Sequence, residues 1–339
     1  MRWKQRPEGS NWGDFGPDDQ IGKMNLITPG RRLAAVREVS EGLAFSLSLP
    51  LDYPGGTNLV PSRRAPRIQA TRRATGELSY NFCFSCQNKS LFDVVSDDAV
   101  TIWTQYSSQW DALAHWGQEF DADGDGVSEI VYYNGWRGGE HILGADQAGG
   151  PMAKKLGIET LAESGAQGRG VMIDLQAIYG DKPVHVGYYD LMRAMDRQNT
   201  SIEPGDFMCL YTGWADLVMA MNRNPDFDKL KNACAVLDGK DPALLKWITD
   251  SGLVAICADN LGVEAVGSAA SAGDGPKHSM MPLHEHCLFK QGIFFGEMWY
   301  FGEIGPWLRR HNRSRFLLTA APLRLPGLVG SPPNPVGTV

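Results

Sequence analysis

Apolar runs that alternate with helical patterns constrain the fold of this chain more than any other feature. Residues 169–175, 206–211 and 253–258 have the length and the apolar composition of buried strands. Helical patterns at residues 186–195 and 241–252 lie between them, and the second begins with an Asp cap followed by a Pro. Strands that alternate with helices in this way predict an α/β fold.

The N-terminal region carries a further helix and strand signal. We expect a helix over residues 27–42, because Thr28 can cap it, Pro29 suits its first turn and Gly42 can end it. Residues 43–51 then alternate apolar and polar side chains, as a half-buried strand does.

Length and composition fit one globular unit. The chain has 339 residues, of which 43% are hydrophobic and 21% are charged, and no internal repeat is visible. We expect a single compact domain over residues 1–339, with an N-terminal arm and helix in residues 1–45 and an extended, Pro-rich strap at residues 320–339.

Charge and hydropathy exclude several classes of partner. The net charge is −7, and the Arg-rich patches are short and diluted, so we do not expect nucleic acid as a partner. No apolar run is long enough to span a membrane, and the N-terminus lacks the apolar segment of a signal peptide, so we expect a cytoplasmic protein. Six cysteines include one C-x-x-C pair, Cys83 and Cys86, which we interpret as ordinary reduced thiols.

Residues 105–116 hold an unusual set of polar side chains. Asp111 and His115 lie four residues apart, with Gln105 and Gln109 just before them and tryptophans on either side. Spacing alone favours a surface pair on one face of a helix, which stabilises a helix by only a few tenths of a kcal/mol.

A second polar group lies in residues 278–299. His278, His284, His286 and Glu297 fall within this segment, although the whole chain has only seven histidines. Any one of them alone is explained as a core or surface residue. Taken with the Asp and His of the earlier segment, the set is better explained by a metal site or by acid/base chemistry, because Zn²⁺ and Mn²⁺ accept carboxylate and imidazole ligands.

Four ordered stretches, at residues 12–29, 107–116, 283–297 and 321–335, make the chain similar to a known family. The chain resembles the cyclase family of metal-dependent hydrolases, which includes bacterial kynurenine formamidase and isatin hydrolase. The resemblance implies the swivelling β/β/α fold of that family. Its motif, H-x-G-T-H-x-D-x-x-x-H, places the Asp on Asp111 and the last His on His115, whereas its first two histidines fall on Gln105 and Gln109. The form Q-W-D-x-L-x-H is typical of a subgroup.

The resemblance also implies a mechanism. Asp111, His284 and Glu297 would be the metal ligands, with His286 as a less favoured alternative to His284. A bound Mn²⁺ or Zn²⁺ would activate a water that attacks a small cyclic or aryl amide, imide or lactone. His115 would act as the general base and acid.

Gln105 and Gln109 leave open which metal the site holds and which reaction it performs. An amide oxygen from Gln105 or Gln109 is a poorer ligand for Zn²⁺ than imidazole, but it suits a harder ion such as Mn²⁺, Mg²⁺ or Ca²⁺. Alternatively, both amides donate hydrogen bonds to a substrate, and His115 serves a metal-free lyase, isomerase or cyclase. A third possibility is a non-catalytic protein that binds a small ligand.

Aromatic and second-layer residues are further candidates. Trp110, Trp116 and Trp103 could line a substrate pocket or pack in the core. The family likeness places Asp259 and Glu264 on a loop near the site.

The acidic segment 121–129 matches a short calcium loop, with a glycine at its sixth position. It fails the full EF-hand pattern because its twelfth position is Tyr132. A solvated acidic turn between strands is the competing interpretation, and any calcium would be structural. The candidate ligands are Asp121, Asp123, Asp125 and Glu129.

The family likeness also implies a homo-oligomer, a dimer or a tetramer, that acts on a small-molecule substrate.

Overall fold

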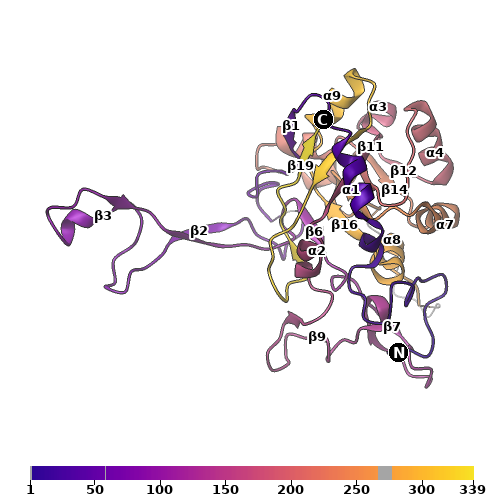
Figure 1. Cartoon of the computed structure of the whole chain (residues 1–339), viewed down its shortest axis with the longest axis horizontal. Coiled ribbons are helices and arrows are strands. Elements are labelled where there is room, and N and C mark those ends of the chain that lie inside the picture. The colour runs from indigo at the N-terminus through magenta and orange to yellow at the C-terminus, as the bar shows by residue number, and fades with distance from the viewer. Residues whose placement is uncertain (1, 58, 266–276) are drawn as a thin grey trace.

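A nine-stranded mixed sheet runs through the body of the computed structural model, which describes residues 2–57, 59–265 and 277–339 (Figure 1). In spatial order the strands are β1 (Ala44–Ser46), β19 (Val336–Thr338), β17 (Arg315–Thr319), β11 (Gln167–Asp174), β13 (Phe207–Tyr211), β15 (Ala255–Ala258), β16 (Phe294–Glu297), β6 (Gln109–Asp111) and β18 (Gly330–Ser331). The four from β11 to β16 are parallel, and the pairs outside them are antiparallel. The predicted α/β fold is confirmed.

The remaining elements lie around this sheet. Three small ribbons pair β7 (Gln118–Phe120) with β8 (Glu129–Val131), β9 (Ile142–Leu143) with β10 (Met152–Ala153), and β12 (Val184–Val186) with β14 (Ala235–Leu237). The α-helices are α1 (Pro29–Val36), α2 (Ile158–Ser164), α3 (Gln176–Tyr179), α4 (Tyr188–Arg197), α5 (Trp214–Ala220), α6 (Phe227–Lys231), α7 (Pro242–Ser251), α8 (Pro282–His284) and α9 (Ile304–Arg310). Short 3₁₀ helices cover Gly22–Leu26, Phe84–Cys86 and Tyr133–Gly135, and a π-helix covers Glu285–Gln291. No helix in the described part of the chain is long and apolar enough to cross a membrane.

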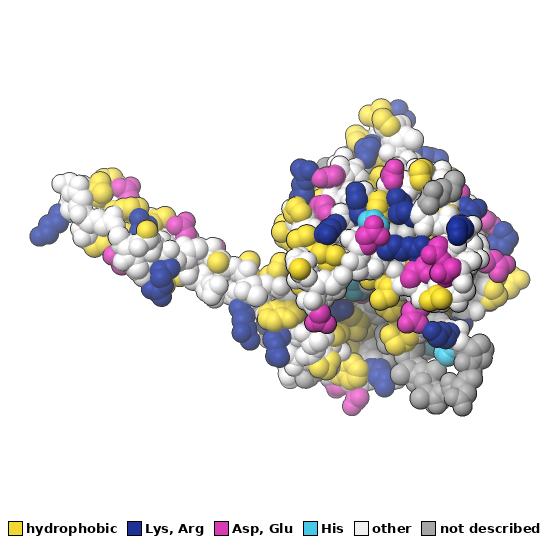
Figure 2. Space-filling view, turned by 90° about the horizontal axis from the view of Figure 1, so that it is seen from below, with side chains coloured by type: hydrophobic (Ala, Val, Ile, Leu, Met, Phe, Trp, Pro, Cys, Tyr) yellow, Lys and Arg dark blue, Asp and Glu magenta, His cyan; other side chains and the backbone are white. Residues whose placement is uncertain are grey.

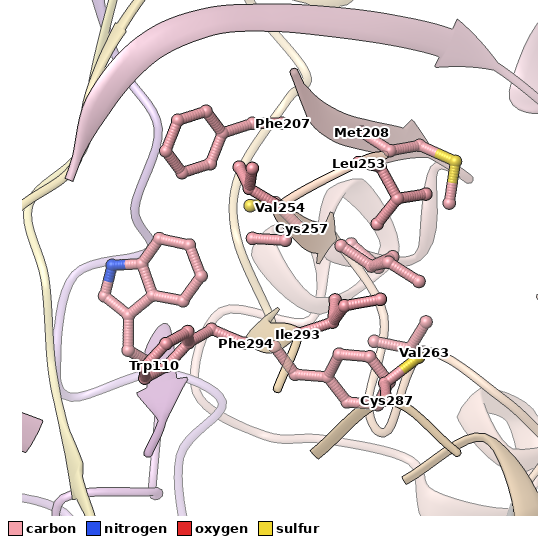
Figure 3. Close-up of a cluster of buried hydrophobic side chains, with 14 of the residues drawn as sticks. Trp110, Phe207, Met208, Leu253, Val254, Cys257, Val263, Cys287, Ile293 and Phe294 are labelled. Atoms are coloured by element: carbon pink, nitrogen blue, oxygen red, sulfur yellow. The ribbon is translucent and has the colours of Figure 1, made fainter. Parts of the chain in front are cut away.

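The central strands and the two helices between them form where the sequence predicts them. Every residue of β13 and β15 is buried, as expected for parallel strands covered on both faces. Asp241 caps α7 by accepting hydrogen bonds from the backbone N–H groups of Ala243 and Leu244. Figure 3 shows the core around these strands, where Phe207, Val254 and Cys257 pack together.

The N-terminal expectations need correction. Thr28 and Pro29 begin α1 as predicted, but the helix ends at Val36, well before Gly42. The backbone N–H groups of residues 41 and 42 instead donate to the carbonyl of Val339 at the C-terminus. The predicted strand over residues 43–51 shortens to Ala44–Ser46, the segment that pairs with β19.

The C-terminal strap completes the chain's own sheet. β18 pairs with β6 at one edge, and β19 lies between β1 and β17. Val339 is fully buried. The strap therefore folds back on the body of its own chain.

Residues 62–103, which we call the arm, project far from the body (Figures 1 and 2). The arm is a two-stranded ribbon in which β2 (Arg67–Ala70) pairs with β5 (Asp98–Thr101) and β3 (Phe82–Cys83) pairs with β4 (Val94–Val95). The arm is an extension of the single α/β domain (Figure 1).

Candidate active site

Asp111 lies on a strand, so the interpretation of Asp111 and His115 as a helical surface pair is wrong. Successive side chains of β6 point to opposite faces of the sheet, which places Gln109 and Asp111 on one face and Trp110 on the other. His115 follows in a turn, where its backbone N–H donates to the carbonyl of Ala112. Its Nε2 lies 3.9 Å from Oδ1 of Asp111.

Trp110 belongs to the core on the opposite face of the sheet (Figure 3). Its indole N–H donates to the carbonyl of Ala320, and its ring packs edge-on against Trp299 at 5.0 Å. Gly296 makes room for this pair, because a Cβ at that position would lie 2.7 Å from the Trp299 ring. Core packing therefore accounts for the full burial of Trp110.

Strand pairing brings the predicted metal ligands together. In the antiparallel register of β6 and β16, Glu297 lies opposite Gln109 and Phe295 lies opposite Asp111. His284, from α8, packs its ring on Phe295 at 4.8 Å. One ligand atom from each of Asp111, His284 and Glu297 lies within 4.8 Å of the others, and all three residues are buried. We call these three residues the carboxylate–histidine cluster.

Glu264 fixes the position of His284. Its carboxylate accepts hydrogen bonds from the backbone N–H groups of Leu283 and His284 and lies 2.9 Å from His284 Nδ1. The other ring nitrogen, Nε2, lies 3.3 Å from Glu297. Burial opposes a charge on the imidazole, but these two carboxylates outweigh it and raise the pKa of His284 to about 10.

The two carboxylates of the cluster respond differently to the same burial. Desolvation raises the pKa of Asp111 above its usual range, despite the nearby His115. For Glu297, burial is the largest single effect and opposes ionisation, but the hydrogen bond from His284 and the positive charges of His284, His115 and Arg63 together outweigh it and lower the pKa. Asp111 is therefore the carboxyl that holds a proton more tightly in the absence of a bound cation.

Gln109 links the two carboxylates. Its Nε2 donates to Asp111 at 3.2 Å and to Glu297 at 3.1 Å. Among the described residues, Oε1 of Gln109 and Oδ2 of Asp111 are buried without a hydrogen-bond partner, and Oε1 of Glu297 faces His284 Nε2 at 3.3 Å. Acceptors left over in one small region indicate a site that can take a donor or a cation.

Gln105 does not join this network. Its amide oxygen accepts a hydrogen bond from Thr104, and its amide nitrogen lies against Gly330 of β18.

Trp116 does lie at the site, with its ring 5.0 Å from the His284 ring. Trp103 lies at the base of the arm, where the guanidinium of Arg67 sits over its ring at 5.9 Å.

The other two histidines of the 278–299 segment lie outside the cluster. His286 contacts Thr249 of α7 at 2.9 Å, and burial lowers its pKa to about 4. His278 is exposed. The geometry therefore selects His284 over His286 as the ligand candidate.

Asp259 links the C-terminal ends of two neighbouring strands. It accepts hydrogen bonds from the backbone and side chain of Thr212 and from the backbone of Gly213, which ties the end of β13 to the end of β15.

Arg63 is a site residue that sequence reasoning missed. Its Nη1 donates to the carbonyl of Gln105 at 2.7 Å, and its positive charge favours the ionised forms of Asp111 and Glu297, against the larger effect of burial on their pKa values. In the sequence it is one of several scattered arginines. No local pattern sets it apart.

The acidic segment forms a turn between β7 and β8. Oxygens of Asp121, Asp123 and Glu129 approach within 4.8 Å of one another, whereas Asp125 is not part of that group. Asp121 accepts hydrogen bonds from three backbone N–H groups, and Glu129 pairs with Arg137. These bonds account for the turn without an ion.

Comparisons with known proteins bear on the fold. A family described as "Putative cyclase" matches residues 45–265. No curated protein matches the chain. A crystal structure of a novel cyclase is 28% identical, with a TM-score of 0.74 over 97% of this chain and 99% of that one. Isatin hydrolase A from Ralstonia solanacearum is 16% identical, with a TM-score of 0.54 over 91% and 97% of the two chains. An isatin hydrolase bound to the product analogue thioisatinate is 14% identical, with a TM-score of 0.54 over 92% and 99%. At these lower identities the likeness shows a shared fold.

Proposed function

The chain belongs to the cyclase family, and from this membership and its buried cluster we propose that it is a metal-dependent hydrolase of a small cyclic or aryl amide, imide or lactone. The observation that carries the proposal is the convergence of Asp111, His284 and Glu297, from three separate elements, within 4.8 Å.

The residues present fit a divalent cation. Two carboxylates and an imidazole are ligands that Mn²⁺ and Zn²⁺ accept, and three protein ligands leave a position open for water. Oδ2 of Asp111 is buried without a hydrogen-bond partner among the described residues, and Oε1 of Glu297 faces His284 Nε2 at 3.3 Å. Since a buried acceptor without a partner costs free energy, a cation would stabilise the site. Glu264 fixes the His284 ring in the way that outer carboxylates fix metal-binding histidines.

A divalent metal held there would supply a Lewis acid that polarises the substrate carbonyl and lowers the pKa of water. The chain's own contribution is proton transfer and positioning. In hydrolysis the acyl carbon gains the hydroxyl of water, the C–N or C–O bond breaks, and the leaving atom gains a proton. His115 is about one fifth exposed and adjoins Asp111, so it can take the proton from water and deliver it to the leaving atom. Trp116 offers a flat wall beside His284.

One observation supports a second candidate function. The Gln109 amide already donates to both carboxylates, which is the kind of contact that a bound cation would replace. This arrangement would also suit a metal-free lyase, isomerase or ring-closing enzyme, or a protein that binds a small ligand without turnover.

Ring opening in isotopically labelled water tests these functions. The protein is stripped with a chelator, reloaded with Mn²⁺ or Zn²⁺, and assayed on a panel of cyclic amides, imides and lactones in H₂¹⁸O. We expect turnover only after reloading, with one heavy oxygen in the new carboxylate. Full turnover in the stripped protein would favour the metal-free enzyme. Tight binding of an aromatic ligand without turnover of any compound would favour the binding protein.

A further inference from the structure

Arg63 is a cation beside the carboxylate–histidine cluster whose hydrogen-bonding capacity is largely unused. Among the described residues, its side chain makes one hydrogen bond, from Nη1 to the carbonyl of Gln105, and no salt bridge. A guanidinium carries five N–H donors in a planar fork, so most of these donors remain for another acceptor. Since the side chain is only partly buried, an acceptor from solution can reach it.

The cluster does not neutralise Arg63. Burial disfavours the ionised forms of Asp111 and Glu297, and the charge of Arg63 opposes this effect on both pKa values, so the guanidinium lies close to the cluster. The direct contacts of the two carboxylates are nevertheless made by other groups, because Gln109 donates to both and His284 faces Glu297. Arg63 therefore adds a positive charge at the edge of the site without closing an ion pair there.

A small cavity adjoins Arg63. Arg63 is the one charged side chain among the described residues that line this cavity, and most of the others are apolar. The hydroxyl of Tyr106 also lines it, but that group already donates to the carbonyl of Gly56. The apolar walls come from Leu59, Val60, Leu261 and Met298. Apolar walls with a single cation suit a ligand that has an apolar body and one anionic group.

Met298 connects the cavity to the cluster, because it follows Glu297 directly. Its φ of 51° lies in the left-handed region, which residues other than glycine seldom adopt. Two hydrogen bonds hold this conformation: its backbone N–H donates to the carbonyl of Asn260, and its own carbonyl accepts from the hydroxyl of Ser108. The turn lets Glu297 face the cluster while Met298 lines the cavity. Strained backbone of this kind is typical of functional sites.

We propose that Arg63 binds a carboxylate group of the substrate, so that the preferred substrate is a cyclic or aryl amide, imide or lactone with a carboxylate substituent away from the bond that breaks. This inference rests on the proposed function. The reacting carbonyl lies at the cluster, the apolar part of the substrate lies against Met298 and Leu261, and the carboxylate accepts two parallel hydrogen bonds from the guanidinium. A divalent cation at the cluster offsets the charges of Asp111 and Glu297, which otherwise repel an anionic substrate.

Benzoate and benzamide, which have nearly the same shape but differ in charge, test the proposal by titration calorimetry. We expect wild type to bind benzoate more tightly than benzamide. Arg63→Gln should weaken benzoate binding by roughly 10- to 100-fold, as expected when hydrogen bonds to a charged group are lost, and leave benzamide binding nearly unchanged. Arg63→Lys should give an intermediate affinity for benzoate, because lysine keeps the charge but lacks the planar fork.

The matched control is Arg64→Gln, which removes the same charge from the neighbouring, exposed position and should leave benzoate binding unchanged. A purely structural role of Arg63 at the arm root predicts that Arg63→Gln weakens benzoate and benzamide equally. That result would overturn the proposal, as would a wild type that does not bind benzoate or an Arg63→Gln variant with unchanged affinity for it.

Benzoate can also bind a metal ion, so the titrations are made on Mn²⁺-loaded protein and on chelator-stripped protein. We expect Arg63→Gln to weaken benzoate binding in both forms. Such a result supports recognition by Arg63 even if no compound is hydrolysed, which separates this proposal from the proposed hydrolase activity. A loss confined to the loaded form would assign the carboxylate to the metal and overturn the proposal.

Kinetics on a matched pair of substrates extend the test to turnover. The pair is a cyclic imide that carries a carboxylate and the same imide with a carboxamide in its place. Arg63→Gln should raise KM for the first compound, with kcat nearly unchanged, and should leave KM for the second compound unaltered. Ring opening of either compound creates a new carboxylate, so an equal change for both would assign Arg63 to the product and overturn the proposal.

Discussion

The carboxylate of Glu264 lies 2.9 Å from Nδ1 of His284, which turns Nε2 of the same ring toward the buried carboxylate–histidine cluster. Glu264 contacts the cluster through the backbone N–H and the ring of His284, so its effect on the site passes through the imidazole.

Glu264→Gln should therefore weaken metal binding without removing a ligand. We expect the affinity for Mn²⁺ or Zn²⁺ to fall by about 10- to 100-fold, as is common when the outer partner of a metal-binding histidine is lost. Titration calorimetry with the metal alone measures the change. Glu285→Gln is the matched control, because Glu285 adjoins His284 in sequence but pairs with Lys290. Equal affinities in wild type and Glu264→Gln would contradict this role.

Metal content tests whether the carboxylate–histidine cluster, and not the neighbouring His286, holds the metal. Protein purified without chelator should contain about one equivalent of manganese or zinc per chain, and Asp111→Ala should lose it. His286→Gln should retain it, because His286 contacts Thr249 instead of the cluster. Elemental mass spectrometry provides the measurement. Metal retained by Asp111→Ala but lost by His286→Gln would place the site elsewhere.

His115→Ala should lose turnover but keep its metal. A positioned general base or acid contributes roughly 10²- to 10⁴-fold to a rate, so kcat should fall within that range. His115 is partly exposed, and its removal should leave the melting temperature nearly unchanged. Metal content and steady-state kinetics on the same sample are both needed. Undiminished kcat would reject the assigned role.

Lys23 should make the stability of the fold depend on alkaline pH. Burial lowers the pKa of Lys23 from 10.5 to about 8, although its ammonium donates to the carbonyls of Ile248 and Thr249. The unfolded chain therefore binds more protons than the folded chain between pH 8 and 10.5, and the free energy of unfolding rises with pH by up to about 3 kcal/mol.

Denaturant unfolding of wild type and Lys23→Met at several pH values isolates this contribution. The stability of wild type relative to the variant should increase from pH 7 to pH 10. The exposed Lys246, replaced by Met, is the control and should show no such trend. A flat difference for Lys23→Met would mean that the ammonium is not destabilised by burial.

The turn at residues 121–129 should be stabilised by its own hydrogen bonds. Asp121 accepts three backbone N–H groups, so Asp121→Ala should lower the melting temperature to the same extent in calcium and in EDTA. Scanning calorimetry in both buffers makes the comparison. A loss seen only in calcium would instead support a structural calcium ion.

Much of the core fold could be predicted from the sequence because parallel strands are buried on both faces. β13 and β15 are apolar throughout and β11 carries the apolar run 171–173, and this composition identifies them without any partner in view. β6 could not be recognised in the same way. Its three residues are too few to display a period of two, so the four-residue spacing from Asp111 to His115 favoured a helix.

Contacts between residues far apart in the sequence could not be predicted either, at the site or in the arm. Asp111, His284 and Glu297 were predicted as a set from the family resemblance, but Arg63 joins them through pairing at the arm root, which no local pattern records. Within the arm, Ile68 lies between Arg67 and Gln69, as an apolar residue does on an ordinary half-buried strand. The sequence indicates that one face of such a strand is covered, without indicating what covers it.

The hydrogen bond from Arg63 to the carbonyl of Gln105 joins the two ends of the arm beside the carboxylates of the cluster. A cation bound by Asp111 and Glu297 would repel the guanidinium that closes this joint. Cation binding and the Arg63 hydrogen bond would then oppose each other through charge, and the effect would be reciprocal: whatever moves the guanidinium away would strengthen cation binding, and the cation would weaken the joint.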